Sequence, residues 1–120
     1  MTYQKLELDD DPKVALAAIR AASSERPVLI FKKSPICPVS HRAEFEFDRW
    51  LESLSDADDV SVGGIDVIAR KPLARGLTAE LGVQHESPQA LWFANGELVW
   101  HDSHGALTRE RFAELLAGDA

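Results

Sequence analysis

The sequence contains one cysteine, Cys37, and this residue is the one best suited to covalent chemistry. The segment Cys37-Pro38-Val39-Ser40 has the spacing C-x-x-S. Proteins that cycle through an internal disulfide use C-x-x-C, because the second thiol resolves the mixed disulfide formed by the first. Ser40 cannot do this, so any mixed disulfide formed at Cys37 must be passed to a thiol on another molecule. A lone cysteine also excludes an intramolecular disulfide and a Cys-rich zinc site.

The surroundings of Cys37 favour its ionised form. A run of apolar residues precedes it and a helix is expected to begin at Pro38, so Cys37 lies where a strand becomes a helix. The free N–H groups and partial positive charge of a helix N-terminus stabilise an anion. Four neighbouring side chains can add positive charge, namely Lys32, Lys33, His41 and Arg42. Because the thiolate is the nucleophile, we expect a reactive thiol; the alternative is a small buried hydrophobic residue.

Other constellations of reactive residues are incomplete. A phosphatase or arsenate-reductase loop needs the pattern C-x5-R, but Ala43 stands at the arginine position and Arg42 falls one residue short. His101 and His104 could suggest a metal, although two histidines in a loop after a strand are more typical of a surface. The histidines and Cys37 show no structural zinc spacing, and no glycine-rich nucleotide loop is present. No metal site is therefore expected.

The elements that must position Cys37 follow from apolar periodicity and turn residues. In chain order, we expect a short edge strand around Leu6, a helix over 12–23, a strand over 28–31, a helix from Pro38, a strand over 60–69, a helix over 72–81, strands over 90–93 and 98–100, and a final helix after Thr108. The buried face of the second helix is expected to carry Ala43, Phe47, Trp50, Leu51 and Leu54. Trp50, Trp92 and Trp100 are expected in the core.

Particular residues mark the ends of these elements. Asp11 precedes a proline at the first helical position, and Gly82 is a typical residue just past a helix C-terminus. The pair Asn95-Gly96 is the strongest short signal of a hairpin, and Thr108 is expected to cap the last helix. The two glycines at 63–64 are expected to form a bulge or a turn within their strand.

This order of elements is typical of the thioredoxin plan, in which a strand, a helix and a strand precede a hairpin and a C-terminal helix. We therefore expect an α/β fold with a central four- or five-stranded mixed sheet and helices on both faces, built as one domain over residues 1–120. In this plan a cis-proline faces the cysteine, and the backbone before it binds the sulfur-bearing chain of a partner. Ser87-Pro88 has the matching position, so we expect a cis bond there, although an ordinary trans turn is the commoner arrangement.

Charge and hydropathy exclude several classes of partner. The chain has 120 residues, with 13 Lys and Arg against 20 Asp and Glu, for a formal charge of −7. Nucleic-acid binding needs clustered cations, so no nucleic acid is expected. No apolar run approaches the length of a membrane helix, and the polar, acidic start does not resemble a signal peptide. We expect a cytoplasmic protein without membrane partners.

Several segments resemble the monothiol bacilliredoxins, the YtxJ-like thioredoxin-fold family. FKKSPICPVS at 31–40 resembles the family segment F-K-H-S-x-x-C-P-I-S, and GVQHESPQAL at 82–91 matches the more diagnostic G-V-x-H-E-S-P-Q-A-L. RKPL at 70–73 matches R-P-L with one extra residue, and WHDSHGALT at 100–108 resembles W-x-x-S-H-x-x-I-T. Departures are Lys33 in place of a usual histidine, Pro35 before the cysteine, and no bulky aromatic residue near Gly105.

The resemblance implies removal of bacillithiol, a low-molecular-weight thiol, from mixed disulfides on client proteins. Cys37 would be the nucleophile, Pro38, Val39 and Ser40 would complete its motif, and Ser87-Pro88 would shape the thiol groove. Bacillithiol would be the co-substrate, with no tightly bound cofactor, and the partners would be bacillithiol and S-bacillithiolated clients. Positive charge for its malyl carboxylates would come from one or two members of a set of cations: Lys32, Lys33, Arg42, Arg70 and Lys71.

Two other functions remain open from the sequence. One is a monothiol glutaredoxin-like scaffold that binds an iron–sulfur cluster between two subunits, against which Pro38 and Val39 argue, since such scaffolds carry C-G-F-S. The other is a non-catalytic thioredoxin-like interaction protein in which Cys37 is inert.

Overall fold

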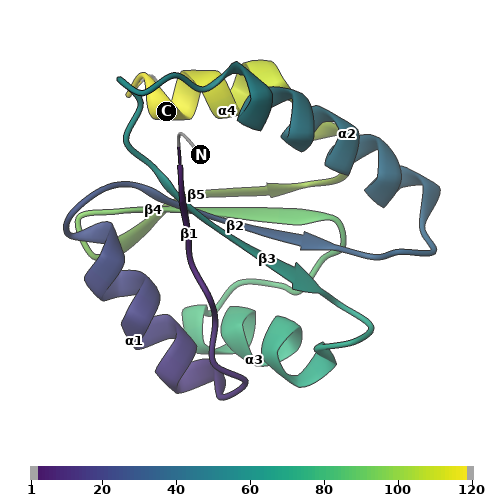
Figure 1. Cartoon of the computed structure of the whole chain (residues 1–120). Coiled ribbons are helices and arrows are strands. Elements are labelled where there is room, and N and C mark those ends of the chain that lie inside the picture. Colours follow the sequence, from purple (N-terminus) through teal and green to yellow (C-terminus); the bar gives the residue numbers. More distant parts are fainter. Residues whose placement is uncertain (1–2, 119–120) are drawn as a thin grey trace.

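A five-stranded mixed sheet forms the centre of the computed structural model, which describes residues 3–118 (Figure 1). The strands are β1 (Gln4–Lys5), β2 (Val28–Lys33), β3 (Ser61–Asp66), β4 (Gln89–Ala94) and β5 (Glu97–Ser103). Their order across the sheet is β1-β3-β2-β4-β5. The first three are mutually parallel, whereas β4 runs antiparallel to both β2 and β5. The expected α/β class and mixed sheet are confirmed.

Helices cover both faces of the sheet, as expected (Figure 1). The helices α1 (Pro12–Ser23) and α3 (Lys71–Leu81) pack on one face, and α2 (Pro38–Ser53) and α4 (Arg109–Leu116) pack on the other. The strand β2 lies in the middle and alternates its side chains between the two faces. Leu29 and Phe31 enter the core beneath α2 and α4, while Val28 and Ile30 enter the core beneath α1 and α3.

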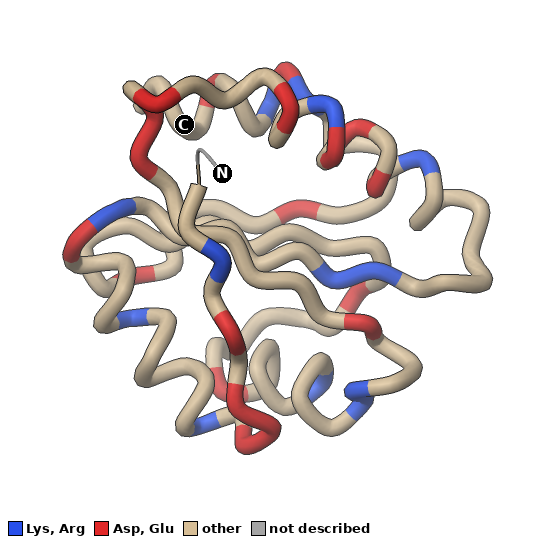
Figure 2. Tube along the Cα trace, in the orientation of Figure 1, with Lys and Arg blue, Asp and Glu red and all other residues tan. Residues whose placement is uncertain are grey.

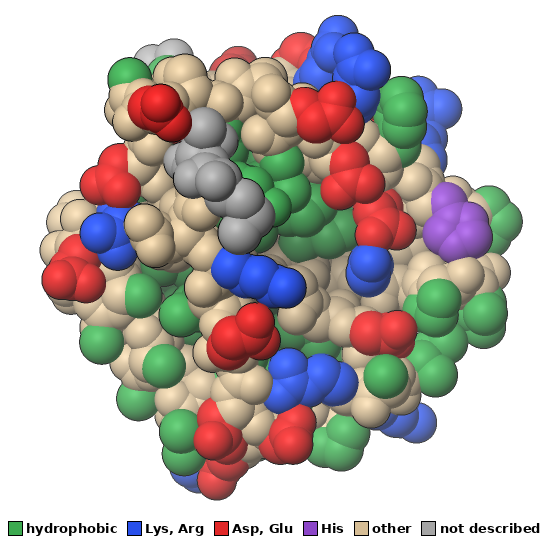
Figure 3. All heavy atoms as spheres, in the orientation of Figure 1, with side chains coloured by type: hydrophobic (Ala, Val, Ile, Leu, Met, Phe, Trp, Pro, Cys, Tyr) green, Lys and Arg blue, Asp and Glu red, His purple; other side chains and the backbone are tan. Residues whose placement is uncertain are grey.

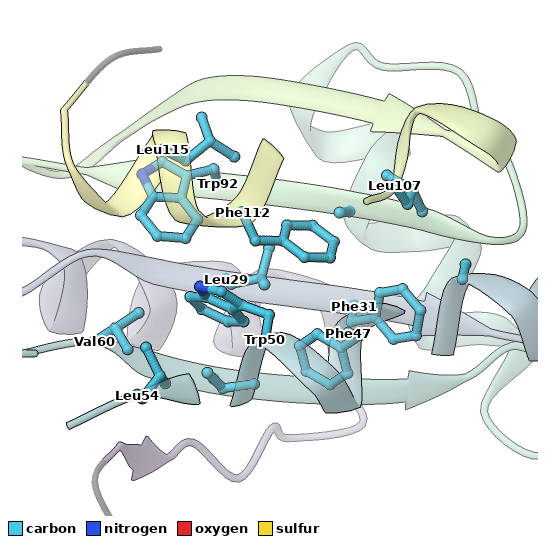
Figure 4. Packing of buried hydrophobic residues seen from close by; sticks show 13 residues of the cluster. Leu29, Phe31, Phe47, Trp50, Leu54, Val60, Trp92, Leu107, Phe112 and Leu115 are labelled. Atoms are coloured by element: carbon cyan, nitrogen blue, oxygen red, sulfur yellow. The ribbon is translucent and has the colours of Figure 1, made fainter. Parts of the chain in front are cut away.

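The core beneath α2 and α4 is rich in aromatic side chains (Figure 4). Phe47 stacks on Phe31 with ring centroids 4.5 Å apart, and Trp50 meets Trp92 edge-on at 6.3 Å. Phe112 of α4 lies 5.5 Å from Trp50. Because aromatic pairs add to the free energy of burial, this cluster anchors α2 on the sheet. Trp100 lies on β5, is only partly buried and packs against this cluster.

The opposite core depends on a close approach of α1 and α3. A Cβ atom added at Gly76 in α3 would lie 2.4 Å from Cγ of Pro12, at the start of α1. No side chain fits at this distance, so glycine allows the two helices to touch. Both helices therefore seal the same face over Ile19, Leu73 and Leu77, which are fully buried.

The expected signals at the ends of the elements are confirmed. The Asp11 carboxylate accepts hydrogen bonds from amides in the first turn of α1, and the Thr108 hydroxyl does the same for α4. Gly82 ends α3 with φ of 69°, a left-handed conformation that glycine adopts without steric cost. Asn95 and Gly96 have φ of 55° and 83° and join β4 to β5 in a two-residue hairpin.

The strand expected over 60–69 is shorter than the sequence indicates. β3 ends at Asp66, whose carboxylate accepts hydrogen bonds from the amides of Ile68 at 2.9 Å and Ala69 at 3.0 Å. These bonds close a turn and lower the pKa of the Asp66 carboxyl group. The apolar residues after Asp66 suggested a longer strand, but the local bonds of an aspartate favour a turn.

The interpretation of Gly63 and Gly64 as a bulge or turn is wrong. Both lie in regular parallel register, opposite Ile30 and Phe31 of β2. A Cβ atom at Gly63 would lie 3.0 Å from Cδ1 of Ile30 and 3.2 Å from the carbonyl oxygen of Leu6. Glycine at this position therefore permits close packing of the N-terminal segment on the sheet.

Acidic residues outnumber basic ones along α2 and along the segment before α1 (Figure 2). Beside α2, the edge of the sheet has an apolar hollow (Figure 3), which is lined by Tyr3, Lys5, Phe47, Leu51, Val62 and Gly64. Over residues 3–118, no helix is both long and apolar enough to cross a membrane.

Candidate functional site

Three segments that are far apart in the sequence meet at the edge of the sheet where β2 and β5 end and β4 begins. The register pairs Lys32 with Gln89 and Gln89 with Ser103, so the end of β2, the start of β4 and the end of β5 lie side by side. The segment that leads into α2 leaves from this edge (Figure 1). The loop before β4 and the 3-10 turn η1 (His104–Ala106) after β5 are at the same edge. Cys37 and Pro88 therefore belong to one end of the molecule.

Cys37 occupies the N-cap position of α2, a helix of 16 residues. Its backbone is extended, with φ of −101° and ψ of 122°, and its side chain is a free thiol that is partly exposed. The carbonyl oxygen of Cys37 accepts the first bond of the helix, from the His41 amide at 3.0 Å. The side chain itself makes no capping bond, so unpaired helix amides and the helix dipole remain available to a sulfur anion.

The loop that carries Cys37 is fixed by side chains of α2. The Ser40 hydroxyl accepts a hydrogen bond from the Ser34 amide at 2.7 Å, and Ser40 is fully buried. His41 Nε2 lies 2.7 Å from the carbonyl oxygen of Pro35, to which its protonated form donates a hydrogen bond. Ser40 is therefore an internal support of the loop, and not an exposed residue of the helix surface.

The bond between Ser87 and Pro88 is cis, as expected. The carbonyl oxygen of Pro88 accepts a hydrogen bond from the His104 amide at 3.1 Å, which joins this loop to η1. The His104 ring lies 3.7 Å from the carboxylate of Glu86. Among the described residues, the Ser87 hydroxyl is the one enclosed side-chain polar atom without a hydrogen-bond partner. The hydroxyl oxygen is buried, so only the backbone of Ser87 is left to meet a bound sulfur-containing chain at this position.

The five cations that were candidates for contacting carboxylates have different environments. Lys32 is fully buried, which corrects the expectation that it contacts a ligand directly. Lys33 forms an ion pair with Glu44 of α2. Arg70 donates to the Asp10 carboxylate at 2.7 Å and to a backbone carbonyl at 2.6 Å. Two of the five expected cations are thus paired and one is enclosed.

Arg42 and Lys71 are exposed. Arg42 lines a groove of about 290 Å³ between α2 and the η1–α4 segment, and the same groove contains Val39, His104 and Gly105. The groove begins two residues after Cys37 and ends beside the segment that contacts Pro88. Arg42 is therefore the exposed cation most directly associated with this end of α2.

Exposed apolar side chains lie next to Cys37 in the sequence and on the loop after β3, which is bonded to the end of β2. Ile36 and Val39 flank the Cys37-Pro38 pair and are 78% and 45% exposed, and Ile68, in the loop after β3, is 52% exposed. Figure 3 shows hydrophobic side chains gathered at this end of the molecule, between the start of α2 and the loop after β3. Exposed apolar residues of this size are typical of surfaces that contact other proteins.

Two residues that organise the site were not identified from the sequence as contacts. His85 and Gln89 both bind the buried amine of Lys32, each at 2.7 Å. They lie within the diagnostic segment at 82–91, but no short-range pattern connects that segment with Lys32. The connection depends on the pairing of β2 with β4. Within the described part of the chain, no three His, Cys, Asp or Glu side chains converge in a group that could hold a metal ion.

Comparisons with known proteins agree with this geometry. The family model described as monothiol bacilliredoxin BrxC matches residues 8–112. A solved structure described as a candidate oxidoreductase with a thioredoxin fold is 28% identical, with a TM-score of 0.69 over 94% of this chain and 92% of that one.

More distant structures share the fold. Reduced desulfothioredoxin from Desulfovibrio vulgaris Hildenborough is 20% identical, with a TM-score of 0.62 over 86% of this chain and 88% of its own. Oxidised thioredoxin O2 from Arabidopsis thaliana is 17% identical, with a TM-score of 0.66 over 98% and 93%. Sequence motifs, fold and family match all lead to the same assignment: the chain belongs to the monothiol bacilliredoxin family and has the thioredoxin fold of a redox protein.

Proposed function

We propose that this protein removes bacillithiol from mixed disulfides of client proteins by thiol–disulfide exchange at Cys37. The observation that carries the proposal is the position of this thiol, partly exposed and uncapped at the N-terminus of α2. The membership of the family supports bacillithiol as the half of the mixed disulfide that Cys37 attacks. The apolar residues around Cys37 support a protein as the other half of the disulfide.

The exchange takes two steps, each of which forms one disulfide and breaks another. The Cys37 thiolate attacks the bacillithiol sulfur, the client thiolate leaves, and a disulfide forms between Cys37 and bacillithiol. A second bacillithiol thiolate then attacks the bacillithiol sulfur of this adduct, which releases the Cys37 thiolate and bacillithiol disulfide. Ser40 has no thiol and its hydroxyl is occupied by the Ser34 amide, so the second step requires a separate molecule.

We infer that Arg42 contributes to recognition of the malyl carboxylates, since it is exposed on the first turns of α2. Lys71 is a second exposed cation for this role, and Lys33 and Arg70 could join it only by leaving their acidic partners. We propose that the backbone at Ser87, at the same end of the molecule as Cys37, receives the sulfur-containing chain.

The test uses a client peptide with one cysteine, loaded with either bacillithiol or glutathione, and follows the freed peptide by mass spectrometry. Wild-type protein should release the bacillithiol peptide about tenfold faster than the glutathione peptide, which corresponds to about 1.4 kcal/mol of transition-state free energy. Cys37→Ser should free neither the bacillithiol peptide nor the glutathione peptide. Full activity of that variant would overturn the mechanism, and equal wild-type rates with both peptides would overturn the bacillithiol preference.

A further inference from the structure

Lys32 is a charged residue enclosed completely within the protein, beneath the loop that precedes β4. It lies on β2, its exposed fraction is 0%, and its neighbours Phe31 and Lys33 point to the opposite face of the sheet. A lysine without solvent contact is rare unless its amine is bound by protein groups. The chemistry at Cys37 does not use Lys32, so its burial requires another reason.

The Lys32 amine binds the loop before Pro88 at two points. Nζ lies 2.7 Å from Nδ1 of His85 and donates to Oε1 of Gln89 at 2.7 Å. The Gln89 side chain extends this network, because Oε1 also accepts from the Glu86 amide at 3.3 Å and Nε2 donates to the carbonyl oxygen of Gln84 at 3.0 Å. Lys32 and Gln89 therefore hold three consecutive residues, 84–86, directly before Ser87 and the cis-proline.

Lys32 and His85 cannot both be protonated in this network. A charged lysine amine only donates, so Nδ1 of His85 must accept from it and the ring must be neutral. Burial and, to a smaller extent, the charge of Arg75 in α3 lower the pKa of Lys32 to about 7, and the carboxylate of Glu86 opposes both effects. Burial, Lys32 and Arg75 also lower the pKa of His85, while Glu86 and the Ala74 backbone oppose them. The pair therefore shares a single positive charge near neutral pH.

We propose that Lys32 is a positioning residue for disulfide exchange, which holds the loop at 84–88 against the sheet through charge-assisted bonds to His85 and Gln89. It touches neither Cys37 nor the expected path of a substrate. It acts on the segment whose backbone would receive the sulfur-containing chain. The kinetic part of this inference rests on the proposed exchange at Cys37, whereas its structural part does not.

The proposal separates two kinds of reaction at Cys37. Alkylation by iodoacetamide needs only the thiol and should change less than about twofold in Lys32→Met, whose side chain has a similar volume. Exchange with a mixed disulfide needs the loop, so its KM should rise with little change in kcat. Because Lys32→Met removes the donor to His85 and Gln89, the wild-type advantage in kcat/KM should be about tenfold.

The experiment compares wild type with Lys32→Met and Gln89→Leu on peptides loaded with bacillithiol and with glutathione. Lys13→Met is the control for removing a lysine charge, since Lys13 pairs with Glu80 on the surface of α1 and α3. Unchanged KM in both core variants would overturn the proposal.

Amide hydrogen exchange at residues 84–87 gives a result that does not depend on activity. Exchange should be faster in Lys32→Met and Gln89→Leu than in wild type and Lys13→Met, because the loop opens locally. Equal exchange in all four proteins would contradict the positioning role. If only the glutathione peptide reacts, the bacillithiol proposal fails while the Lys32 effect is still measured on that peptide.

Discussion

The buried amine of Lys32 should make the stability of the protein depend on pH in the alkaline range. Its pKa is about 7 in the folded protein, against an ordinary value of 10.5. Between these values the unfolded chain binds a proton that the folded protein does not, so the free energy of unfolding rises as the pH rises. Below about pH 7 the amine is charged in both states and this dependence disappears.

The slope can be worked out from the proton count. One proton contributes about 1.4 kcal/mol per pH unit. Between pH 7.5 and pH 9, the unfolding free energy of wild type should therefore rise by about 2 kcal/mol relative to Lys32→Met, which has no amine to titrate. At a fixed pH, the difference in unfolding free energy between the two proteins also depends on the hydrogen bonds to His85 and Gln89 that Lys32→Met loses. The change of this difference with pH depends only on the proton count.

Urea unfolding at several pH values measures this difference directly. Trp50 and Trp92 are buried at 1% and 2% exposure, so their fluorescence reports the loss of the core. Lys13→Met should follow wild type across the range, because Lys13 lies on the surface. Parallel curves for wild type and Lys32→Met would refute the reasoning, since they would mean that Lys32 titrates alike in both states.

Three further substitutions test the packing that supports the site. Trp50→Ala should lower the free energy of unfolding by about 3–5 kcal/mol in urea titrations, because it empties the centre of the aromatic cluster; a loss below about 1 kcal/mol would contradict the packing described. Ser40→Ala should cost about 1–3 kcal/mol by the same measurement and speed amide exchange at Ser34, whose N–H loses its acceptor; unchanged exchange at Ser34 would argue against that bond. Gly76→Ala should destabilise by about 1–3 kcal/mol, because the new methyl group meets Pro12, and a thermal midpoint equal to wild type would show that the helices can separate without cost.

The sequence predicts the elements of this fold well where local chemistry decides them. Asp11, Gly82, Asn95-Gly96 and Thr108 each act through bonds or backbone angles within a few residues, and each expectation is confirmed. The cis bond before Pro88 is confirmed as well, but its prediction depended on the fold plan.

The sequence fails where the outcome depends on contacts across the sheet. Lys32 looks like a surface cation next to Lys33, and only the pairing with Gln89, 57 residues away, shows why it is buried. Gly63 resembles a turn residue until the chain passing over it is known. The end of β3 at Asp66 is a different case, because two local amides compete with an apolar pattern that favours a longer strand.

The bond between Ser40 and the Ser34 amide has a consequence for attempts to convert this protein into a dithiol enzyme. Ser40→Cys would supply the missing second sulfur, but sulfur is a weak hydrogen-bond acceptor and a larger atom than oxygen. The position is completely enclosed, so the new thiol would disturb the turn that presents Cys37. Gaining an internal disulfide would therefore require the loop from Ser34 to Cys37 to be redesigned together with position 40.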